Sequence, residues 1–576
     1  MNFNIKKNWW VLLILILILI PSAYLRLEDY TGEGFGGDAE NTIFAAVFPH
    51  NPHSYFPGFV STEPPLGNYI IGMGCMASGE DFSQVGNVKP LFFPDRFMYI
   101  GDAAAKAKGY CFFPIYLFSF LFLLATIIFA FLFFNKKSAL YFIGLIAFSS
   151  LIIQFSRFLH VEIIFWTFTM LGMLFLWLGY KGNKDLLYFS ISFFFFGLGG
   201  GTKFTGGATL IFAGLLIIEK YKLELLYLIK LLLEKFDLNY SKKITKFSEK
   251  YKPFLYALII PSAIAFFTLF WVFEFSFYNF FETYRLMTSV NWVGSGSLHL
   301  TTGIFTAIYS FLLRSNIFDL IIFILTIPIF FSLLFKRNKT KQEKFAFYLT
   351  IFGILVITLY GNTIAPNTGM SYRSFPLLLG FLLMMPLLFS NKNYLFLDNL
   401  KFIKSKKFFL VFILIYILFC SFTLISANHS VRGNSLLCKF SEHECNVLVY
   451  NELLGSSISD AAIYIKDSLL PNETVYSGYT QIWFYLEHEQ ALYSYLWREQ
   501  FKQKYSYTPS IEEYVKYFDV NGKKITYVIL SSGNYDNKDK MTLEFMEKYK
   551  PTKIISKNGV DTINIYYFGE GGLLLR

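Results

Sequence analysis

Long apolar segments separated by short charged ones fill the first three quarters of the chain. A helix rises about 1.5 Å per residue, so roughly 20 apolar residues cross the roughly 30 Å hydrocarbon core of a bilayer. Eleven runs approach or exceed this length, at residues 9–25, 112–134, 139–155, 158–180, 186–202, 206–219, 254–275, 317–335, 345–360, 375–390 and 408–427. The pattern therefore predicts a mainly α, polytopic helical membrane protein with about 11 transmembrane helices.

The first of these runs has the layout of a secretory signal peptide, because it follows Lys6 and Lys7. Many further spans come after it, however, and the residues at 21–23, Pro-Ser-Ala, are a poor cleavage site. The run is therefore interpreted as a retained first helix.

The basic residues are divided unevenly between the two sides of the predicted bundle. With the N-terminus inside, the short inner segments hold 25 of the 51 Lys and Arg residues and the outer connections hold 10. Because Lys and Arg favour inner loops, this asymmetry predicts a cytoplasmic N-terminus and, after eleven crossings, an outside C-terminus. The net charge of +11 then follows from topology and does not indicate a nucleic-acid partner.

Two soluble pieces face outward under this topology. A first outer loop, residues 26–111, lies within a membrane domain of residues 1–427, and a tail covers residues 428–576. The tail pattern predicts a helix over 460–467, a buried strand over 525–530 and a strand in the alternating segment after residue 561. We expect a C-terminal extracytoplasmic α/β domain. It contains no catalytic motif and is interpreted as a packing or acceptor-presenting domain.

The cysteines agree with an oxidising outer compartment. Cys438 and Cys445 of the tail are close enough in sequence for a small-loop disulfide, with a zinc site as the alternative, whereas Cys75, Cys111 and Cys420 lie in or near apolar runs. No organelle address signal is found, so the expected location is a prokaryotic cell membrane.

Candidate chemistry gathers in the first outer loop. The sequence GFGGDAEN at 34–41 places two carboxylates, Asp38 and Glu40, shortly beyond the first helix. In STEPPLGN at 61–68, two consecutive prolines favour an extended, rigid turn that holds Glu63 in place. Ionisable groups at a membrane surface are candidates for chemistry, although a solvated pair of loop acids is the alternative for Asp38 and Glu40.

This order of residues resembles the protein O-mannosyltransferase family of the GT-C glycosyltransferases (glycosyltransferase family 39-like). That family has an adjacent Asp-Glu pair and a later His-Pro-Pro-Leu-Gly-Lys. Here Ala39 separates the two acids, Glu63 replaces the His and Asn68 replaces the Lys. A Glu before the prolines is similar to the related bacterial lipid A aminoarabinose transferases, so the resemblance indicates the superfamily and leaves the subfamily open.

Three more short motifs follow in the order of that family, all on the predicted outer side. SRFLHVE at 156–162 is similar to its Ser-Arg with an acid five positions later. GGGTKFTG at 199–206 is similar to its Gly-rich segment that ends in Lys and a small residue. YRSFP at 372–376 is similar to its aromatic-Arg-Pro entry to a late helix. The resemblance covers residues 1–427 and does not extend into the tail.

The resemblance implies an inverting glycosyltransferase that moves a monosaccharide, most often mannose in the nearest family, from a polyprenyl- or dolichyl-phosphate donor. A carboxylate then takes the proton of the attacking acceptor hydroxyl. Asp38 is expected to be this base, and Glu40 is the alternative because the inserted Ala39 leaves the alignment open. Glu63 is expected to bind sugar hydroxyls or to orient a cation.

The departing phosphate needs cations. Arg157, Lys203 and Arg373, the last beside Tyr372, each lie at the outer end of a predicted span and are the candidates. Their alternative role is to snorkel to lipid head groups. Glu162 is expected either to help bind substrate or to form an ion pair with Arg157.

The expected partners are the lipid-linked sugar donor, membrane lipid, and an acceptor that is a protein, a glycan or a lipid. The resemblance requires no metal, although paired acids such as Asp38 and Glu40 can hold a divalent cation. His160 lacks the partner spacing of a metal ligand and is interpreted as a packed or interfacial residue.

Three alternatives remain open on the sequence. Oligosaccharyltransferases share the multi-span plan, but their Trp-Trp-Asp signature is absent here. A membrane transporter or flippase for a lipid-linked sugar also needs ionisable residues at membrane depth, although this chain lacks repeated halves. A sugar-binding protein without activity is the third, because Ala39, Glu63 and Asn68 depart from the family pattern.

Overall fold

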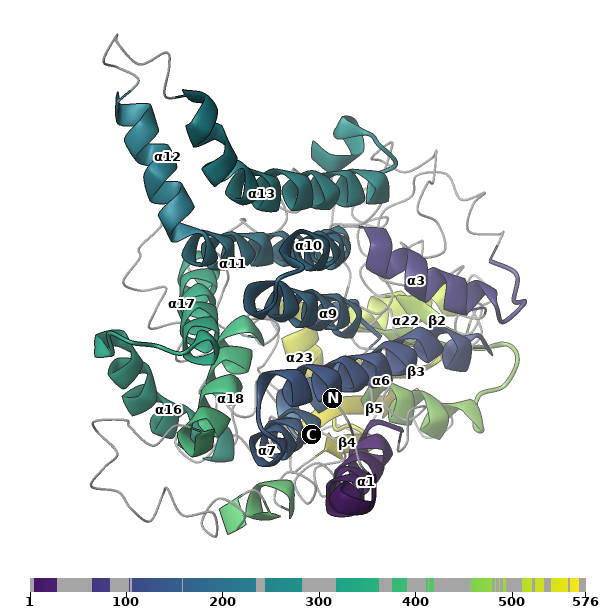
Figure 1. Cartoon of the computed structure of the whole chain (residues 1–576). Helices are drawn as coiled ribbons and strands as arrows, with labels where there is room; N and C mark the ends of the chain where they lie inside the picture. Colours follow the sequence, from purple (N-terminus) through teal and green to yellow (C-terminus); the bar gives the residue numbers. More distant parts are fainter. Residues whose placement is uncertain are drawn as a thin grey trace.

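The computed structural model of the chain contains a bundle of helices and a five-stranded sheet (Figure 1). It describes residues 5–27, 65–82, 103, 106–157, 159–234, 244–281, 317–361, 375–390, 411–412, 414–418, 457–478, 482, 486, 491–493, 510–520, 524–532, 540–557 and 560–568.

Helices occupy the segments at which the apolar pattern predicts membrane spans. Their bounds are α1 (Ile5–Leu27), α6 (Lys108–Phe133), α7 (Lys136–Ala147), α8 (Ser150–Phe155), α9 (Glu162–Lys181), α10 (Asp185–Thr202), α11 (Phe204–Lys220), α13 (Ile244–Val272), α16 (Ile317–Phe335), α17 (Lys341–Gly361) and α18 (Phe375–Ser390). Within the described ranges, four helices are long and apolar enough to cross a membrane, at Trp9–Leu27, Lys108–Phe133, Glu162–Lys181 and Lys252–Val272. The chain is therefore an integral membrane protein, and the total of eleven spans stays a prediction.

Two helical features differ from the sequence expectation. The predicted span 139–155 is divided, because α7 ends at Ala147 and α8 begins at Ser150. The first outer loop contains a helix, α3 (Pro65–Met76), where the two prolines predict an extended turn. Pro65 occupies the first helical position, which suits proline because the N–H missing there has no partner inside a helix.

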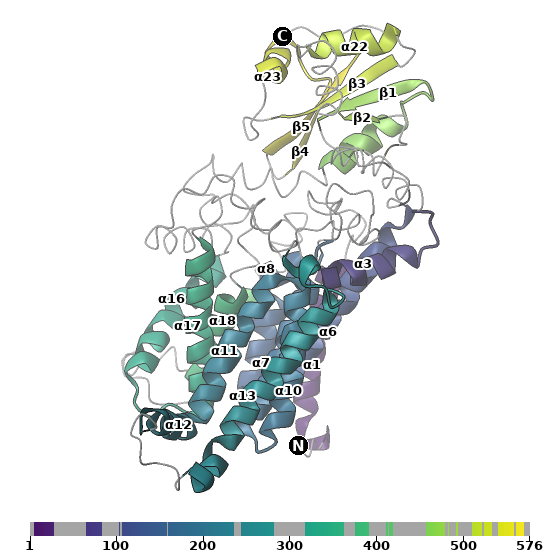
Figure 2. The same cartoon turned by 90° about the horizontal axis from the view of Figure 1, so that it is seen from above.

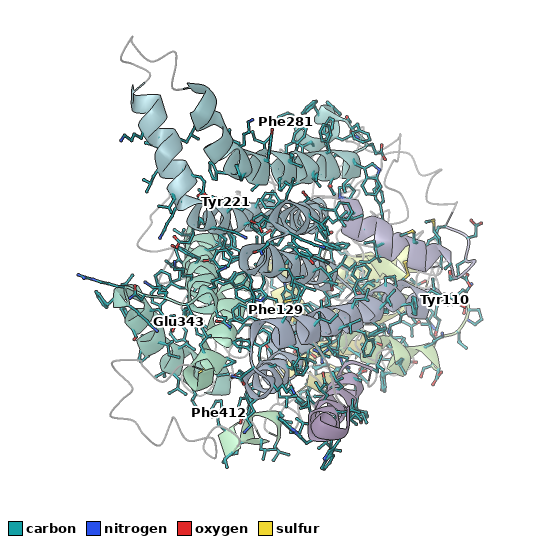
Figure 3. The ribbon with its side chains drawn as sticks, in the orientation of Figure 1. Tyr110, Phe129, Tyr221, Phe281, Glu343 and Phe412 are labelled. Carbon is teal, nitrogen blue, oxygen red and sulfur yellow. A yellow bond between two sulfur atoms is a disulfide. The ribbon has the colours of Figure 1, made fainter. Side chains whose placement is uncertain are left out.

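Aromatic rings fill the region where α6, α9 and α17 meet. The ring centroid of Phe133 lies 4.5 Å from that of Trp177 and 5.5 Å from that of Phe345. Phe129, one turn earlier on α6, lies among the helices in Figure 3 and is 1% exposed. Such pairs stabilise packing beyond the area that they bury, so much of the high Phe content belongs to the bundle core.

The connections predicted to be cytoplasmic lie together at one end of the bundle. Gln342 donates a hydrogen bond to the carbonyl of Phe133 at 3.0 Å, and Lys341 donates to that of Lys181 at 3.2 Å. Lys220 donates to the carbonyl of Gly179 at 2.6 Å, where the negative end of the α9 dipole favours a cation. Figure 2 shows α12 (Lys222–Glu234) and the N-terminus at this end, and α3 and α8 at the opposite end.

The tail contains the sheet. Its strands are β1 (Glu473–Ser477), β2 (Ala491–Tyr493), β3 (Lys524–Ser531), β4 (Lys553–Lys557) and β5 (Val560–Tyr567). They lie in the order β2-β1-β3-β5-β4, and β1 is parallel to β2 and β3 while β5 is antiparallel to β3 and β4. Strands are thus present at both sequence-predicted positions.

Helices cover both faces of this sheet. Along β3, Tyr527 and Ile529 pack with the helix at 457–466, whereas Val528 and Leu530 pack with α22 (Ile511–Val520) and α23 (Lys540–Lys548). This alternation follows from the two-residue period of a strand. Figure 2 shows the sheet beyond the end of the bundle that carries α3 and α8. The domain boundary after residue 427 lies outside the described residues and stays a prediction.

A disulfide joins α3 to the start of α6, between Cys75 and Cys111. The sequence interpretation treats both cysteines as parts of apolar runs and does not predict the bond, while Cys438 and Cys445 lie outside the described residues. The two helices also touch closely, because a Cβ on Gly74 would lie 2.6 Å from the carbonyl oxygen of Tyr110, which Figure 3 shows at the rim of the bundle.

We expect the Cys75→Ser variant to unfold at a lower temperature than the wild type. The disulfide closes a sequence separation of 36 residues, for which chain entropy implies a stabilisation of about 3–4 kcal/mol. Thermal unfolding in detergent measures the change, and Cys420→Ser is the control that leaves this bond intact. Labelling of Cys75 by a maleimide in unreduced protein would contradict the assignment.

Candidate active site

Helix ends meet around two oppositely charged side chains at the α3 end of the bundle. Glu162 is the first residue of α9, and Lys203 is the single residue between α10 and α11. Lys203 has an extended backbone, with φ −153° and ψ 131°, so the chain reverses there. Its N–H donates to the carbonyl of Gly199 at 2.8 Å, and its carbonyl accepts the N–H of Gly206 at 2.8 Å. The reversal fixes the position from which the Lys203 side chain projects.

The glycines of the Gly-rich segment let α10 and α11 approach closely at this reversal. A Cβ on Gly206 would lie 2.4 Å from the carbonyl carbon of Gly199 and 2.6 Å from the nitrogen of Gly200. Both are backbone atoms, which cannot turn aside as a flexible side chain can. The tight turn that presents Lys203 therefore requires glycine at position 206.

We expect Gly206→Ala to destabilise the protein by about 1–3 kcal/mol through overpacking. Gly207→Ala is the matched control, because a Cβ there meets nothing within 4 Å and alanine favours a helix. The midpoints of thermal unfolding of the two variants are compared with that of the wild type. Equal midpoints for Gly206→Ala and Gly207→Ala would contradict the close approach of the helices.

Glu162 bridges two basic side chains. Its Oε1 forms a salt bridge with the Nζ of Lys203, and its Oε2 contacts the Nδ1 of His160. The side chains of Glu162 and Lys203 are 1% and 8% exposed, and that of His160 is 18% exposed. The N-terminal end of α9 adds a favourable dipole for the carboxylate. Glu162 thus holds both basic groups at this end of the bundle.

Helix α3 packs directly beside this ion pair. A Cβ on Gly67 would lie 2.6 Å from a methyl carbon of Val161 and 2.8 Å from that of Thr202. Val161 and Thr202 immediately precede Glu162 and Lys203, so the Pro-Pro-Leu-Gly motif touches both charged positions through their neighbours. Asn68, which follows Gly67, is buried with 2% exposure. Three of the sequence motifs therefore converge in space.

Arg157 is buried and contacts the outer end of α1. Its side chain is 2% exposed, and its Nη1 donates to the carbonyl of Leu25 at 2.7 Å. The last carbonyls of a helix lack partners within the helix, so this bond caps α1. The sequence suggests an ion pair between Glu162 and Arg157. In the structure, Glu162 forms its ion pair with Lys203. Arg157 consequently anchors the helix from which the first outer loop departs.

Arg26 is a buried residue that the sequence reasoning misses. It donates to the carbonyls of Ser22 and Ala147, each at 3.0 Å, and to the hydroxyl of Ser119 at 3.1 Å. These bonds tie α1 to α6 and α7. Ser22 and Ser119 lie within long apolar runs, and buried hydroxyls need hydrogen-bond partners. These two serines are the sequence signal that could have indicated a buried polar partner.

The predicted site residues therefore have three outcomes. Glu162 and Lys203 meet, Arg157 caps α1, and Asp38, Glu40, Glu63, Tyr372 and Arg373 lie outside the described residues, so that their roles stay predictions. His160, interpreted as a packed or interfacial residue, contacts the carboxylate two residues later. Over the part of the chain that the structure describes, no group of three His, Cys, Asp or Glu could hold a metal ion.

Residues 59–281 match the family model of dolichyl-phosphate-mannose-protein mannosyltransferase. The matched segment contains α3, Glu162 and Lys203, and it begins after Asp38 and Glu40. The match confirms the resemblance to GT-C glycosyltransferases that the sequence motifs predict. No curated protein matches the chain at a significant level.

The solved structures that are similar to the chain at low identity include ArnT and an oligosaccharyltransferase. ArnT from Cupriavidus metallidurans bound to undecaprenyl phosphate has 12% identity and a TM-score of 0.43, with 97% of this chain and 98% of that chain covered. An Archaeoglobus fulgidus oligosaccharyltransferase tethered with an acceptor peptide has 15% identity and a TM-score of 0.39, with 92% of this chain and 70% of that chain covered. Undecaprenyl phosphate and the acceptor peptide are ligands of those two proteins.

Proposed function

We propose that this chain is a membrane glycosyltransferase that moves a monosaccharide, with mannose as the first candidate, from a polyprenyl- or dolichyl-phosphate donor to an acceptor. The observation that carries the proposal is the convergence of α3, α9 and the α10–α11 turn around the Glu162–Lys203 pair. The family match over residues 59–281 spans these elements and supports the same activity.

Lys203 is proposed to hold the donor phosphate. It lies where two apolar helices end, which is the level of a lipid phosphate whose prenyl chain stays in the bilayer. An ammonium group offers three hydrogen-bond donors and a point charge to phosphate oxygens. Because Glu162 already orients this group, little reorganisation is needed as negative charge develops on the leaving phosphate.

The proposed reaction is a single inverting displacement. The acceptor hydroxyl attacks the anomeric carbon, and Asp38, or Glu40 in the alternative assignment, takes the hydroxyl proton. The bond between the anomeric carbon and the phosphate oxygen breaks, and its electron pair leaves with the polyprenyl phosphate. Arg373 is proposed to add a second cation for this group, and Glu63 to bind sugar hydroxyls. The proposal requires no metal.

Two features support an outer location for this reaction. Lys and Arg are concentrated in the connections at the opposite end of the bundle, as in cytoplasmic loops. The Cys75–Cys111 disulfide lies at the α3 end, and disulfides persist in oxidising compartments. A prokaryotic cell membrane with the tail outside is the proposed setting. The acceptor is a protein, a glycan or a lipid, which the tail is proposed to present.

The activity is tested with purified protein in lipid nanodiscs and a panel of polyprenyl-phosphate monosaccharides, including mannose. Release of free polyprenyl phosphate, measured by mass spectrometry, is expected for one donor in the panel. A flippase moves the intact donor and breaks no bond in it, so a flippase alone would release no polyprenyl phosphate. If every donor remains intact with protein, glycan and lipid acceptors present, the proposed activity is wrong.

A further inference from the structure

The end of α13 has an unusual backbone at an acidic residue. Glu274 and Phe275, just beyond the last residue of α13, both have φ of 56°, in the left-handed region that glycine normally occupies. The N–H of Glu274 bonds to the carbonyl of Trp271 at 2.8 Å, and that of Phe275 bonds to the carbonyl of Phe270 at 2.9 Å. These two bonds form the Schellman pattern with which helices commonly end, and Glu274 occupies the left-handed position that glycine usually takes in it.

A tyrosine of α3 orients the Glu274 carboxylate. The hydroxyl of Tyr69 donates to Oε1 of Glu274 at 3.3 Å. Burial and the adjacent carboxylate both raise the pKa of Tyr69 above its usual value, so the phenol keeps the proton that it donates. The pair links α3 to α13 at the surface of the protein, because the Glu274 side chain is exposed.

Glu274 lies at the end of the bundle at which the donor phosphate is proposed to bind. Tyr69 belongs to α3, the helix whose Gly67, on the opposite face, packs against the residues that precede Glu162 and Lys203. A Cβ on Gly201 would lie 2.8 Å from a methyl carbon of Val272, so the end of α13 is packed on the end of α10. Val272 and Gly201 precede Glu274 and Lys203 by two residues each, so Glu274 and Lys203 lie at the same end of the bundle.

Exposed aromatic side chains lie on both sides of Glu274 in the sequence. They are Trp271, Phe275, Phe277, Tyr278 and Phe281, each 55–61% exposed, and Figure 3 shows Phe281 beyond α13. Aromatic residues gather at the level of the lipid head groups. The sugar of a lipid-linked donor lies next to its phosphate, and therefore at this same level.

We propose that Glu274 binds hydroxyl groups of the donor sugar while Lys203 holds the phosphate that carries it. This inference rests on the proposed function and assigns a new residue to it. A carboxylate accepts hydrogen bonds from sugar hydroxyls at both of its oxygens, and Tyr69 sets its direction.

The test separates binding from backbone strain by comparing Glu274→Gly with Phe275→Gly. Each change relieves one left-handed residue, so both variants are expected to unfold at a higher temperature than the wild type. Only Glu274→Gly removes the carboxylate, and it should raise the KM for polyprenyl-phosphate mannose about tenfold or more. Phe275→Gly should leave that KM unchanged. Glu274→Gln, which keeps the size of the side chain, should also raise KM while kcat changes less.

An unchanged KM in both Glu274→Gln and Glu274→Gly would overturn the proposal and leave Glu274 as a structural link to Tyr69. An equal rise of KM in Phe275→Gly would overturn it too, because the loop shape and not the carboxylate would then control binding. Wild-type protein is measured alongside. If it neither binds nor consumes the donor, the proposed function itself fails, and this inference fails with it.

Discussion

Replacing Asp38 by Asn is expected to lower the rate of sugar transfer by about 10²–10⁴-fold, the contribution typical of a general base. The amide keeps the shape of the side chain but cannot take the proton of the acceptor hydroxyl. Donor binding should persist, because Lys203 and not Asp38 is proposed to hold the phosphate. Single-turnover transfer from a radiolabelled polyprenyl-phosphate sugar measures the chemical step, and donor binding is measured separately on the same preparation.

Glu40→Gln is the matched variant for this prediction, since it removes the second carboxylate of the loop. If Glu40→Gln abolishes transfer while Asp38→Asn does not, the two residues exchange roles. If both variants transfer sugar at the wild-type rate, neither carboxylate is the base, and the assignment of the first outer loop to catalysis is wrong.

Glu162→Gln is expected to destabilise the protein by about 3–5 kcal/mol, because it removes the negative charge from a buried ion pair with the ammonium of Lys203. The same change frees Lys203 and His160 from their shared anchor, so we also expect transfer activity to fall sharply. Thermal unfolding in nanodiscs measures the first effect, and donor turnover under conditions where the variant is folded measures the second.

A double variant, Glu162→Leu with Lys203→Met, separates stability from activity. Replacing a buried ion pair by apolar residues of similar size is often neutral or stabilising, so much of the lost stability should return. Transfer should remain absent, because no ammonium is left to hold the phosphate. Full activity in the folded double variant would show that the pair serves structure alone.

The membrane architecture could be predicted largely from the sequence. Apolar runs separated by charged turns indicate helices with little ambiguity, because the bilayer requires every backbone group to be bonded within the span. A buried apolar run and an alternating segment similarly predicted two strands of the tail. The helix after Pro65 could not be predicted from its neighbours, since consecutive prolines favour both an extended turn and the first position of a helix.

The site could be predicted only in part. The order of the motifs predicted that both Glu162 and Lys203 belong to the site. Their pairing depends on the chain reversal at Lys203, and no local sequence pattern reveals that reversal. Arg157 belongs to the same motif as Glu162, yet its side chain contacts the end of α1. The last carbonyls of a helix lack partners within the helix, and a cation can bond to them. The Cys75–Cys111 bond joins segments that only the folded chain brings together.

The most direct test is an experimental structure of the protein in nanodiscs with polyprenyl phosphate bound. We expect a phosphate oxygen within hydrogen-bond distance of Lys203 Nζ, about 2.7–3.2 Å, beside α3, with the prenyl chain leading into the bilayer. A phosphate bound at another part of the protein, with the Glu162–Lys203 pair unchanged and α3 without contact to the lipid, would contradict it.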